Sequence, residues 1–333
     1  CAVTATKAGD TQYAQATATQ TVTIVKAGQT ITAANFVDRS WTSATASLNG
    51  SATASSSLTV TWSSTTTSVC TVTGITLALV SSGACSLTVS QAGNSNYDAA
   101  ADVVVGFTVN KASVAIGSFA LASKVYGDAA FDITNPTATF SGSVDGTWGY
   151  ASGTPSVATI SGNRVTVLTA GSSVVTATFT PTDSGKYAVR TTTATLTVDK
   201  ATPTFTWSSV SATYGDANAA ITAPTVGGSV AGSWSYASAT NSVVAVSGSS
   251  LDFGNVGSSV VTATFTPTDT ANYVSGGTVT MTVTVGQATP TFTWSNVSAS
   301  FGDADAAIVA PTVAGSVAGT WSYASATTSV VAI

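Results

Sequence analysis

The fold is decided by a sixteen-residue stretch that occurs twice. It reads Ala201-Thr-Pro-Thr-Phe-Thr-Trp-Ser-Ser-Val-Ser-Ala-Thr-Tyr-Gly-Asp216 and returns 87 residues later as Ala288-Thr-Pro-Thr-Phe-Thr-Trp-Ser-Asn-Val-Ser-Ala-Ser-Phe-Gly-Asp303. A tryptophan and a tyrosine that follows a polar turn keep nearly the same period. They are Trp62, Trp148, Trp234 and Trp321, and Tyr13, Tyr97, Tyr187 and Tyr273. Three independent markers at one period predict tandem units of about 87 residues.

Within one unit, apolar and polar residues alternate with a period of two. Val261, Ala263 and Phe265 alternate with threonines, and a second such run carries Val279, Met281, Val283 and Val285. This period is typical of strands with one buried face, and Gly- and Pro-containing turns separate the runs. The sequence therefore predicts an all-β protein made of tandem immunoglobulin-like β-sandwich domains, each with about seven short strands.

The units meet without a Gly/Ser-rich or Pro-rich spacer, which predicts a stiff or semi-stiff rod. The boundaries read Val25-Lys-Ala27, Asn110-Lys-Ala112, Asp199-Lys-Ala201 and Gly286-Gln-Ala288. The expected division is residues 1–25 as the C-terminal part of a repeat, 26–110, 111–199 and 200–286 as three repeats, and 287–333 as the N-terminal part of another. Both ends match the interior of a unit, so we expect a window cut from a longer array.

Composition excludes several kinds of chemistry. The 333 residues include 14 acidic side chains, all Asp, 9 basic side chains and no histidine, for a net charge of −5. Without His there are no His-dependent hydrolases, His-ligated zinc sites or haem sites, and no nucleophile with its activating base stands out. So few cations argue against nucleic-acid binding, and no apolar run is long enough to insert into a membrane. The expectation is a protein that is not an enzyme.

Cys70 and Cys85 flank a predicted strand pair. The corresponding positions in the next two units are held by Ala158 and Ser173, and by Val244 and Ser259. Paired replacement predicts a disulfide, with two buried free thiols as the alternative. Closing a loop of about 15 residues contributes roughly 3 kcal/mol, and a disulfide implies an oxidising compartment. A partner for Cys1 would lie upstream of the first residue.

The repeats resemble a known family. The runs Ser156-Val-Ala-Thr-Ile-Ser-Gly162 and Val165-Thr-Val-Leu-Thr-Ala-Gly171, together with the Tyr-Gly-Asp element, are similar to the bacterial immunoglobulin-like tandem repeats, YGX-type and related, of large surface adhesins and extracellular fibre proteins. The first unit departs from this pattern, with Asn35-Phe-Val-Asp-Arg39 roughly where the Tyr-Gly-Asp turn is expected. The resemblance implies an extracellular stalk, adhesin or fibre and identifies no ligand.

The recurring tryptophans have two interpretations. One is a core position between two sheets, which recurrence in every unit favours, and the other is a platform on which sugars stack. Trp207 and Trp294 share strand faces with Phe205 and Phe292, so a core position is again expected.

The recurring aspartates, Asp216 and Asp269 in the third complete unit, could ligate calcium. Calcium needs six to eight oxygen ligands, however, and Gly-Asp and Thr-Asp are ordinary turn sequences. Asp303-Ala-Asp305 is the nearest approach to a ligand cluster. No cofactor is expected, and calcium stays open as an alternative.

Two features of the surface have plain explanations. Exposed Thr rows are compatible with ice binding, but sandwich sheets twist and Thr suits the outer face of a strand. Lys111 and Lys200 lie at unit boundaries and not within strands, which disfavours isopeptide cross-links.

The sequence thus predicts a structural segment of a very large secreted bacterial protein at the cell surface, either a repetitive stalk or a subunit of an extracellular filament or sheath. Its expected partners are copies of itself or adjacent repeats, and a third variant joins the partial units of two chains. The alternative is an adhesive module that recognises glycans or neighbouring cell surfaces through its loops.

Overall fold

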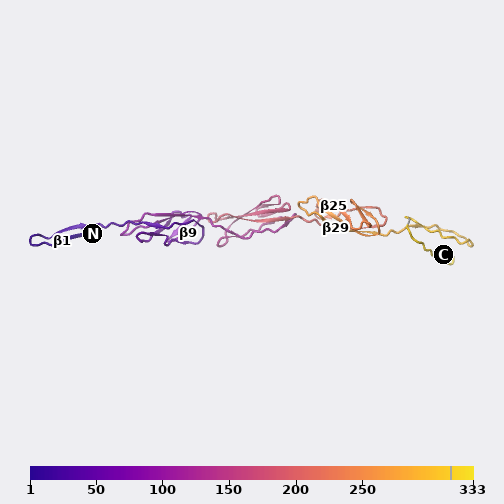
Figure 1. The fold of residues 1–333 in the computed structure, drawn as a ribbon, viewed down its shortest axis with the longest axis horizontal. Helices are drawn as coiled ribbons and strands as arrows, with labels where there is room; N and C mark the ends of the chain where they lie inside the picture. Colours follow the sequence, from indigo (N-terminus) through magenta and orange to yellow (C-terminus); the bar gives the residue numbers. More distant parts are fainter. Residues whose placement is uncertain (316) are drawn as a thin grey trace. The chain divides into compact units, whose positions relative to one another are not determined.

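A computed structural model describes residues 1–315 and 317–333, and these form short strands with a single 3-10 turn, η1 (Gly227–Ser229). The strands gather into successive bundles along the chain, so that β25 and β29 lie in the same bundle (Figure 1). The chain divides into two compact units, Cys1–Asp199 and Lys200–Ile333, and each is described by itself.

The first unit begins with a hairpin and continues into a sandwich. The hairpin pairs β1 (Ala2–Lys7) with β2 (Ala16–Thr21). The sandwich has a four-stranded sheet in the order β4 (Arg39–Ser40), β11 (Val103–Asn110), β10 (Gly83–Ser90), β7 (Thr61–Ser64). A three-stranded sheet has the order β5 (Ala46–Ser47), β9 (Thr76–Leu79), β8 (Cys70–Thr73), and β3 (Ile31–Ala33) pairs with β6 (Ala52–Ala54).

A second sandwich in the same unit repeats this arrangement. Its four-stranded sheet has the order β13 (Lys124–Val125), β20 (Arg190–Asp199), β19 (Gly171–Pro181), β16 (Gly146–Ser152). The three-stranded sheet has the order β14 (Phe131–Asp132), β18 (Arg164–Val167), β17 (Ala158–Ser161), and β12 (Ala115–Ile116) pairs with β15 (Ala138–Thr139).

The second unit contains the third sandwich. Its four-stranded sheet has the order β22 (Val210–Thr213), β29 (Gly277–Gly286), β28 (Gly257–Pro267), β25 (Gly232–Ser238). The three-stranded sheet has the order β23 (Ala219–Ala220), β27 (Ser250–Phe253), β26 (Val244–Ser247), and β21 (Phe205–Thr206) pairs with β24 (Thr225–Val226). Beyond it, β30 (Phe292–Thr293) pairs with β31 (Thr312–Val313).

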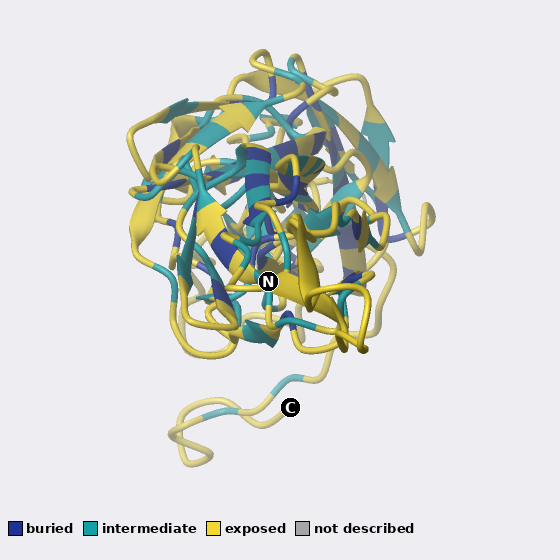
Figure 2. Ribbon diagram, turned by 90° about the vertical axis from the view of Figure 1, so that its left-hand side faces the viewer, coloured by how far each residue is buried: buried dark blue, intermediate teal, exposed yellow. Residues whose placement is uncertain are grey.

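The alternating pattern predicts the core correctly. Val261, Ala263 and Phe265 on β28 are at most 1% exposed, and Met281 and Val283 on β29 are buried opposite them. The neighbouring threonines turn outward, so buried and exposed residues alternate in bands along the strands (Figure 2). Tandem β-sandwiches of immunoglobulin type are therefore the fold of this chain.

Each sandwich has nine strands and not about seven, because the first two expected strands are each broken. The first expected strand of the third sandwich is divided into β21 and β22. Strand β21 pairs with β24, whereas β22 pairs in parallel with β29 of the four-stranded sheet. The second is interrupted by Pro136 between β14 and β15 and by Pro224 between β23 and β24, since proline donates no ladder hydrogen bond. In the first sandwich Gly50, at φ +73°, lies at the same break.

Candidate functional site

The junction between the first two sandwiches is formed by an alanine that is built into the second one. Ala112 lies two residues after β11 ends at Asn110, and it is fully buried. Its N–H donates to the Lys186 carbonyl at 2.8 Å, and its carbonyl accepts from the Ala188 N–H at 2.9 Å. These bonds form a parallel bridge to Tyr187, so the chain is part of the next sandwich after one intervening residue.

The same bridge recurs at two of the other three boundaries. Ala27 pairs with Tyr97, and Ala201 pairs with Tyr273, in each case within one sandwich. The recurring tyrosine of the sequence thus lies in the loop that clamps the start of its own sandwich. Each of these boundary alanines is therefore hydrogen-bonded into the sandwich that follows it.

An aspartate shapes the clamping loop of the second sandwich. The Lys186 backbone N–H donates to Asp183 Oδ1 at 3.1 Å, and the Lys186 ammonium lies 2.8 Å from Oδ2. The hydrogen bond from this ammonium lowers the pKa of Asp183, while the carboxylate raises the pKa of Lys186. Asn94 makes a related turn in the first sandwich, one residue closer to its tyrosine, by accepting from the backbone N–H of Tyr97 at 3.0 Å.

Aromatic side chains pack across this junction inside the first unit. Trp41, from the first sandwich, is 7% exposed and contacts Tyr187 with ring centroids 5.3 Å apart. Phe140 completes the cluster at 6.1 Å from Trp41 and 5.7 Å from Tyr187, and the Lys186 ammonium lies 5.4 Å from the Trp41 ring. Aromatic pairs and a cation over an indole are each attractive. The two sandwiches therefore share one hydrophobic cluster.

Trp41 corrects one sequence interpretation. Asn35–Arg39 was the expected counterpart of the Tyr-Gly-Asp turn, but the Trp41 N–H donates to Asn110 O as the Tyr126 N–H donates to Asp199 O, both at 2.8 Å. Trp41 therefore holds the tyrosine position. Asp38 instead accepts from the Thr108 N–H at 2.6 Å. The spacing of 85 residues from the aromatic ring at 41 to Tyr126 was the signal in the sequence that could have located it.

The recurring aspartates serve backbone turns. Asp128, Asp216 and Asp303 each accept the N–H of the residue three positions earlier, at 2.7 to 2.9 Å. Asp269 accepts from the side chain and backbone of Asn272, and the side-chain hydrogen bond lowers its pKa. Within residues 1–315 and 317–333, no three His, Cys, Asp or Glu side chains come together as a group able to hold a metal ion.

The recurring tryptophans occupy different depths. Trp62 does not share the position of Trp148, because it pairs with Val89, four residues after Cys85, as Tyr150 pairs with Ala177, four residues after Ser173. Trp62 is 8% exposed and meets Phe36 edge to face, while Trp148 and Trp234 are half-buried against Phe179 and Phe265. The Trp207 indole N–H donates to the Thr222 carbonyl at 2.8 Å. In the last segment, Trp294 and Trp321 are more exposed and pair with Tyr323 and Phe292.

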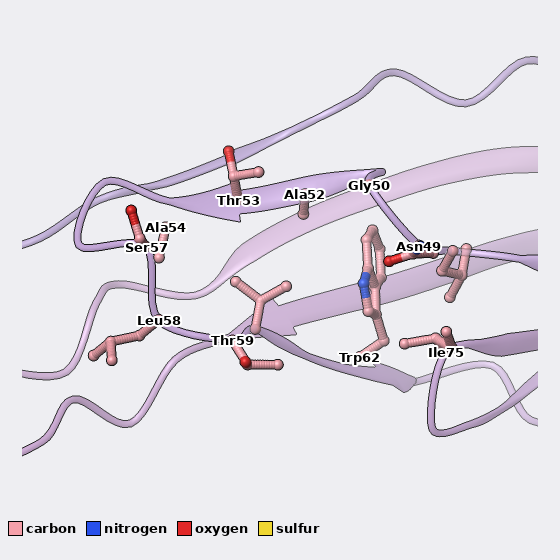
Figure 3. A pocket seen from close by; sticks show the side chains of 12 residues that line it. Asn49, Gly50, Ala52, Thr53, Ala54, Ser57, Leu58, Thr59, Trp62 and Ile75 are labelled. Atoms are coloured by element: carbon pink, nitrogen blue, oxygen red, sulfur yellow. The ribbon is translucent and has the colours of Figure 1, made fainter.

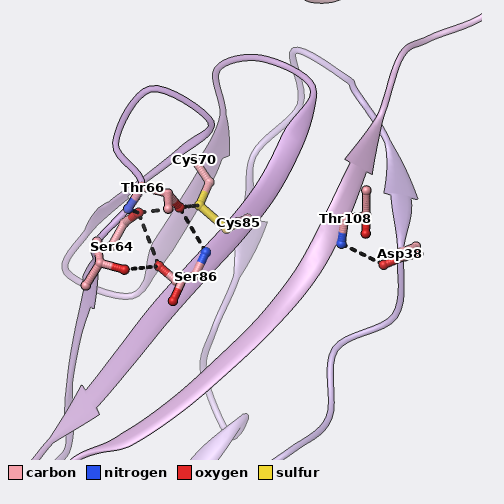
Figure 4. Close-up of a disulfide and its surroundings, with 8 residues drawn as sticks. Asp38, Ser64, Thr66, Cys70, Cys85, Ser86 and Thr108 are labelled. Atoms are coloured by element: carbon pink, nitrogen blue, oxygen red, sulfur yellow. Dashed lines mark hydrogen bonds between the residues drawn. A yellow bond between two sulfur atoms is a disulfide. The ribbon is translucent and has the colours of Figure 1, made fainter.

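A disulfide joins Cys70 on β8 to Cys85 on β10 and so links the two sheets of the first sandwich (Figure 4). Its Cα atoms are 5.7 Å apart. In the second sandwich the same place is filled by buried Ala158 and Ser173, where the Ser173 hydroxyl bonds the Ser152 hydroxyl at 2.9 Å and accepts the Thr154 N–H at 3.1 Å. A hydrogen-bonded hydroxyl thus replaces the covalent link. Cys1 is exposed and has a free thiol.

Lys200 Nζ donates to the Thr270 carbonyl at 2.7 Å. No helix of the described residues has the length and apolar character needed to cross a membrane.

No family model and no curated protein matches the sequence. Among solved structures, the chain is similar to Drosophila N-cadherin EC1-4 at 12% identity, over 68% of this chain and 66% of that one, with a TM-score of 0.28. It is similar to surface layer protein SbsC, domains 1-6, at 14% identity over 88% and 46%, with a TM-score of 0.25. For the human desmocollin-1 ectodomain the identity is 8%, the coverage 80% and 63%, and the TM-score 0.29.

The chain spans less than two thirds of the length of each of these three structures. With TM-scores of 0.25 to 0.29, the chain is not assigned to the protein family of any of these three structures. The assignment to immunoglobulin-type sandwiches rests on the order of its own strands.

Proposed function

We propose that the chain is a non-enzymatic, force-bearing segment of an extracellular bacterial surface protein, as a repetitive stalk or as a subunit of a filament or sheath. The observation that carries this proposal is the parallel pairing of a strand near the start of each sandwich with its last strand, β4 with β11, β13 with β20 and β22 with β29. Tension on the two ends of a sandwich pulls such strands in opposite directions. The hydrogen bonds between them are then loaded together in shear and do not open one by one.

The boundary alanines support the same proposal. Because Ala27, Ala112 and Ala201 are each bridged into the sandwich that follows, we propose repeats at 26–110, 111–199 and 200–286. Residues 1–25 and 287–333 then belong to further repeats, in part. With one residue between the last strand of a repeat and the next alanine, tension passes from sandwich to sandwich with little slack.

The disulfide supports an extracellular location, since such bonds persist in oxidising compartments. The composition supports self-association, because a chain with only 7% charged residues has few like charges on its surface to keep copies apart. Electron microscopy of the intact protein separates the two forms of the proposal. Long unbranched fibres indicate a filament or sheath, and single particles indicate a stalk.

The test of the proposal is the stiffness of the junction in the first unit. Spin labels at Ser63→Cys and Thr193→Cys, both exposed, report the distance between the first two sandwiches in the full chain carrying Cys1→Ser. We expect a narrow distance distribution, which Trp41→Ala broadens. A broad distribution in the parent protein contradicts the proposal.

Tyr150→Ala is the matched control for Trp41→Ala. This tyrosine is half-buried, but its ring contacts are Phe119 and Trp148 of its own sandwich. We expect the distribution to keep its width in this variant. Broadening of equal size in both variants assigns the effect to general loosening and contradicts the role of the junction cluster.

A further inference from the structure

A cleft opens beside Trp62 in the first sandwich. It has a volume of about 330 Å³ and lies between β6 and the start of β7 (Figure 3). Strand β6 pairs with β3 on one side, and no strand of the described chain pairs with its other side, which borders the cleft. The volume is at the lower end of the range for ligand pockets, about 300–1,000 Å³, so the cleft suits a ligand of one or two small rings.

The Trp62 indole carries an unused hydrogen-bond donor into this cleft. The side chain belongs to a residue that is only 8% exposed, and its nitrogen edge turns toward the space between β6 and β7 (Figure 3). Within the described chain, Trp62 Nε1 has no hydrogen-bond acceptor, whereas the indole N–H groups of Trp41 and Trp207 donate to backbone carbonyls at 3.1 and 2.8 Å.

The Trp62 side chain is buried as a whole, but its N–H is not sealed off, since the buried side-chain nitrogen or oxygen without a partner in the described chain is Arg39 Nε. An indole N–H that is open to a cleft can donate to an acceptor on a ligand. Tyr150 and Tyr236 hold the equivalent place in the later sandwiches, since they pair with Ala177 and Ala263 as Trp62 pairs with Val89, so this indole N–H has no counterpart there. An acceptor for the Trp62 N–H would therefore lie in the cleft.

The lining of the cleft indicates the chemistry of that acceptor. Asn49, Thr53, Ser57 and Thr59 offer one amide and three hydroxyl groups, while Leu58 and Ile75 are among the apolar residues. None of the lining residues is charged. We propose that this cleft is a binding site for a neutral saccharide, whose ring oxygen or hydroxyl accepts from Trp62 Nε1 and whose apolar ring face lies on the aliphatic side chains.

A neutral sugar matches this set of groups better than other ligands. Its several hydroxyls can both donate and accept, as Asn, Ser and Thr side chains do. An acidic sugar or a phosphate would find no cation in the lining, and a cationic ligand would find no carboxylate. The site goes beyond the force-bearing role and does not depend on it.

The test follows the Trp62 indole N–H by two-dimensional NMR of the intact protein, which has 7 tryptophans and therefore few indole signals. The probes are neutral glucose, galactose, mannose and N-acetylglucosamine mono- and disaccharides at millimolar concentration. We expect one probe class to shift the Trp62 signal in a saturable manner. Trp62→Phe identifies the signal by deleting it, and we expect this variant to bind about tenfold more weakly, as the loss of one hydrogen bond implies.

Two variants keep the result independent of folding. Asn49→Ala changes an exposed loop residue of the lining, and we expect it to weaken binding while the melting temperature stays unchanged. Trp234→Phe makes the same substitution at a half-buried tryptophan of the third sandwich, which does not line this cleft, and we expect unchanged binding. The proposal is overturned if no saccharide shifts the Trp62 signal, if Asn49→Ala binds as the parent does, or if an extended neutral peptide shifts the signal and the saccharides do not.

Discussion

The replacement of the disulfide by a hydroxyl network yields the sharpest prediction. Cys70→Ala with Cys85→Ser installs in the first sandwich the pair that the second sandwich has, Ala158 and Ser173. The hydroxyl partners are already present, because Ser64 and Thr66 lie beside the disulfide, where Ser152 and Thr154 lie in the second sandwich (Figure 4).

The magnitude follows from two opposing effects. Removing a cross-link with a sequence separation of 15 costs about 3 kcal/mol in the chain-entropy model. Two new hydrogen bonds to the introduced hydroxyl, from the partners equivalent to Ser152 and Thr154, return about 0.5–1.5 kcal/mol each. The Ala/Ser variant should therefore lose about 0–2 kcal/mol, and Cys70→Ala with Cys85→Ala should lose about 3 kcal/mol.

The assay is native-state hydrogen exchange of β10 amides, since a chain of several sandwiches does not unfold in one step. The β19 and β28 amides of the same molecule serve as internal standards, and their exchange should not change. Equal losses for the Ser and Ala variants would show that the hydroxyl network does not substitute for the disulfide. An undiminished stability in both variants would show that the disulfide contributes nothing.

Two further predictions concern turns. Asp183→Asn should keep the turn, as Asn94 does in the first sandwich, but should lose the charge pair with Lys186. Because folding lowers the pKa of Asp183, its contribution is present above the ordinary value of 3.8 and lost as pH falls below it. Thermal melts from pH 2 to 6 should show a smaller acid loss in the variant, and equal profiles would contradict the charge pair. Gly127→Ala should cost about 1–2 kcal/mol, because φ is +91° and nothing lies near an added Cβ, so the cost is conformational. Gly149→Ala, with no strained φ and equal space, is the control, and hydrogen exchange of β13 and β16 measures both.

Much of the fold could be predicted from the sequence, because it depends on local periodicity. The alternation around Val261 and Phe265 assigns the core of β28, and the paired loss of Cys70 and Cys85 in later repeats points to their contact. Period and spacing also locate the boundary alanines, although the clamp on Ala112 is visible only in the bridge to Tyr187.

The junction and the cleft could not be predicted in the same way. Trp41 is not followed by the Gly-Asp that marks its counterparts in the later sandwiches. Its contact with Phe140 joins two different sandwiches, and a sequence pattern that repeats within each sandwich gives no information on such a contact. The cleft depends on β6 being paired on one side alone and on how deeply the Trp62 ring is buried, and the recurring tryptophan marker says nothing of either.

The most direct test of a force-bearing role is to stretch the full chain by its two ends in a single-molecule force experiment. The parallel terminal strands predict separate force peaks for the three complete sandwiches, each followed by an extension of about 300 Å for a repeat of 87 residues. The first sandwich should extend about 50 Å less, because the disulfide holds 15 residues in its loop, and a reductant should restore this length. Extension without force peaks would contradict the account, and so would a peak spacing that does not change when the reductant is added.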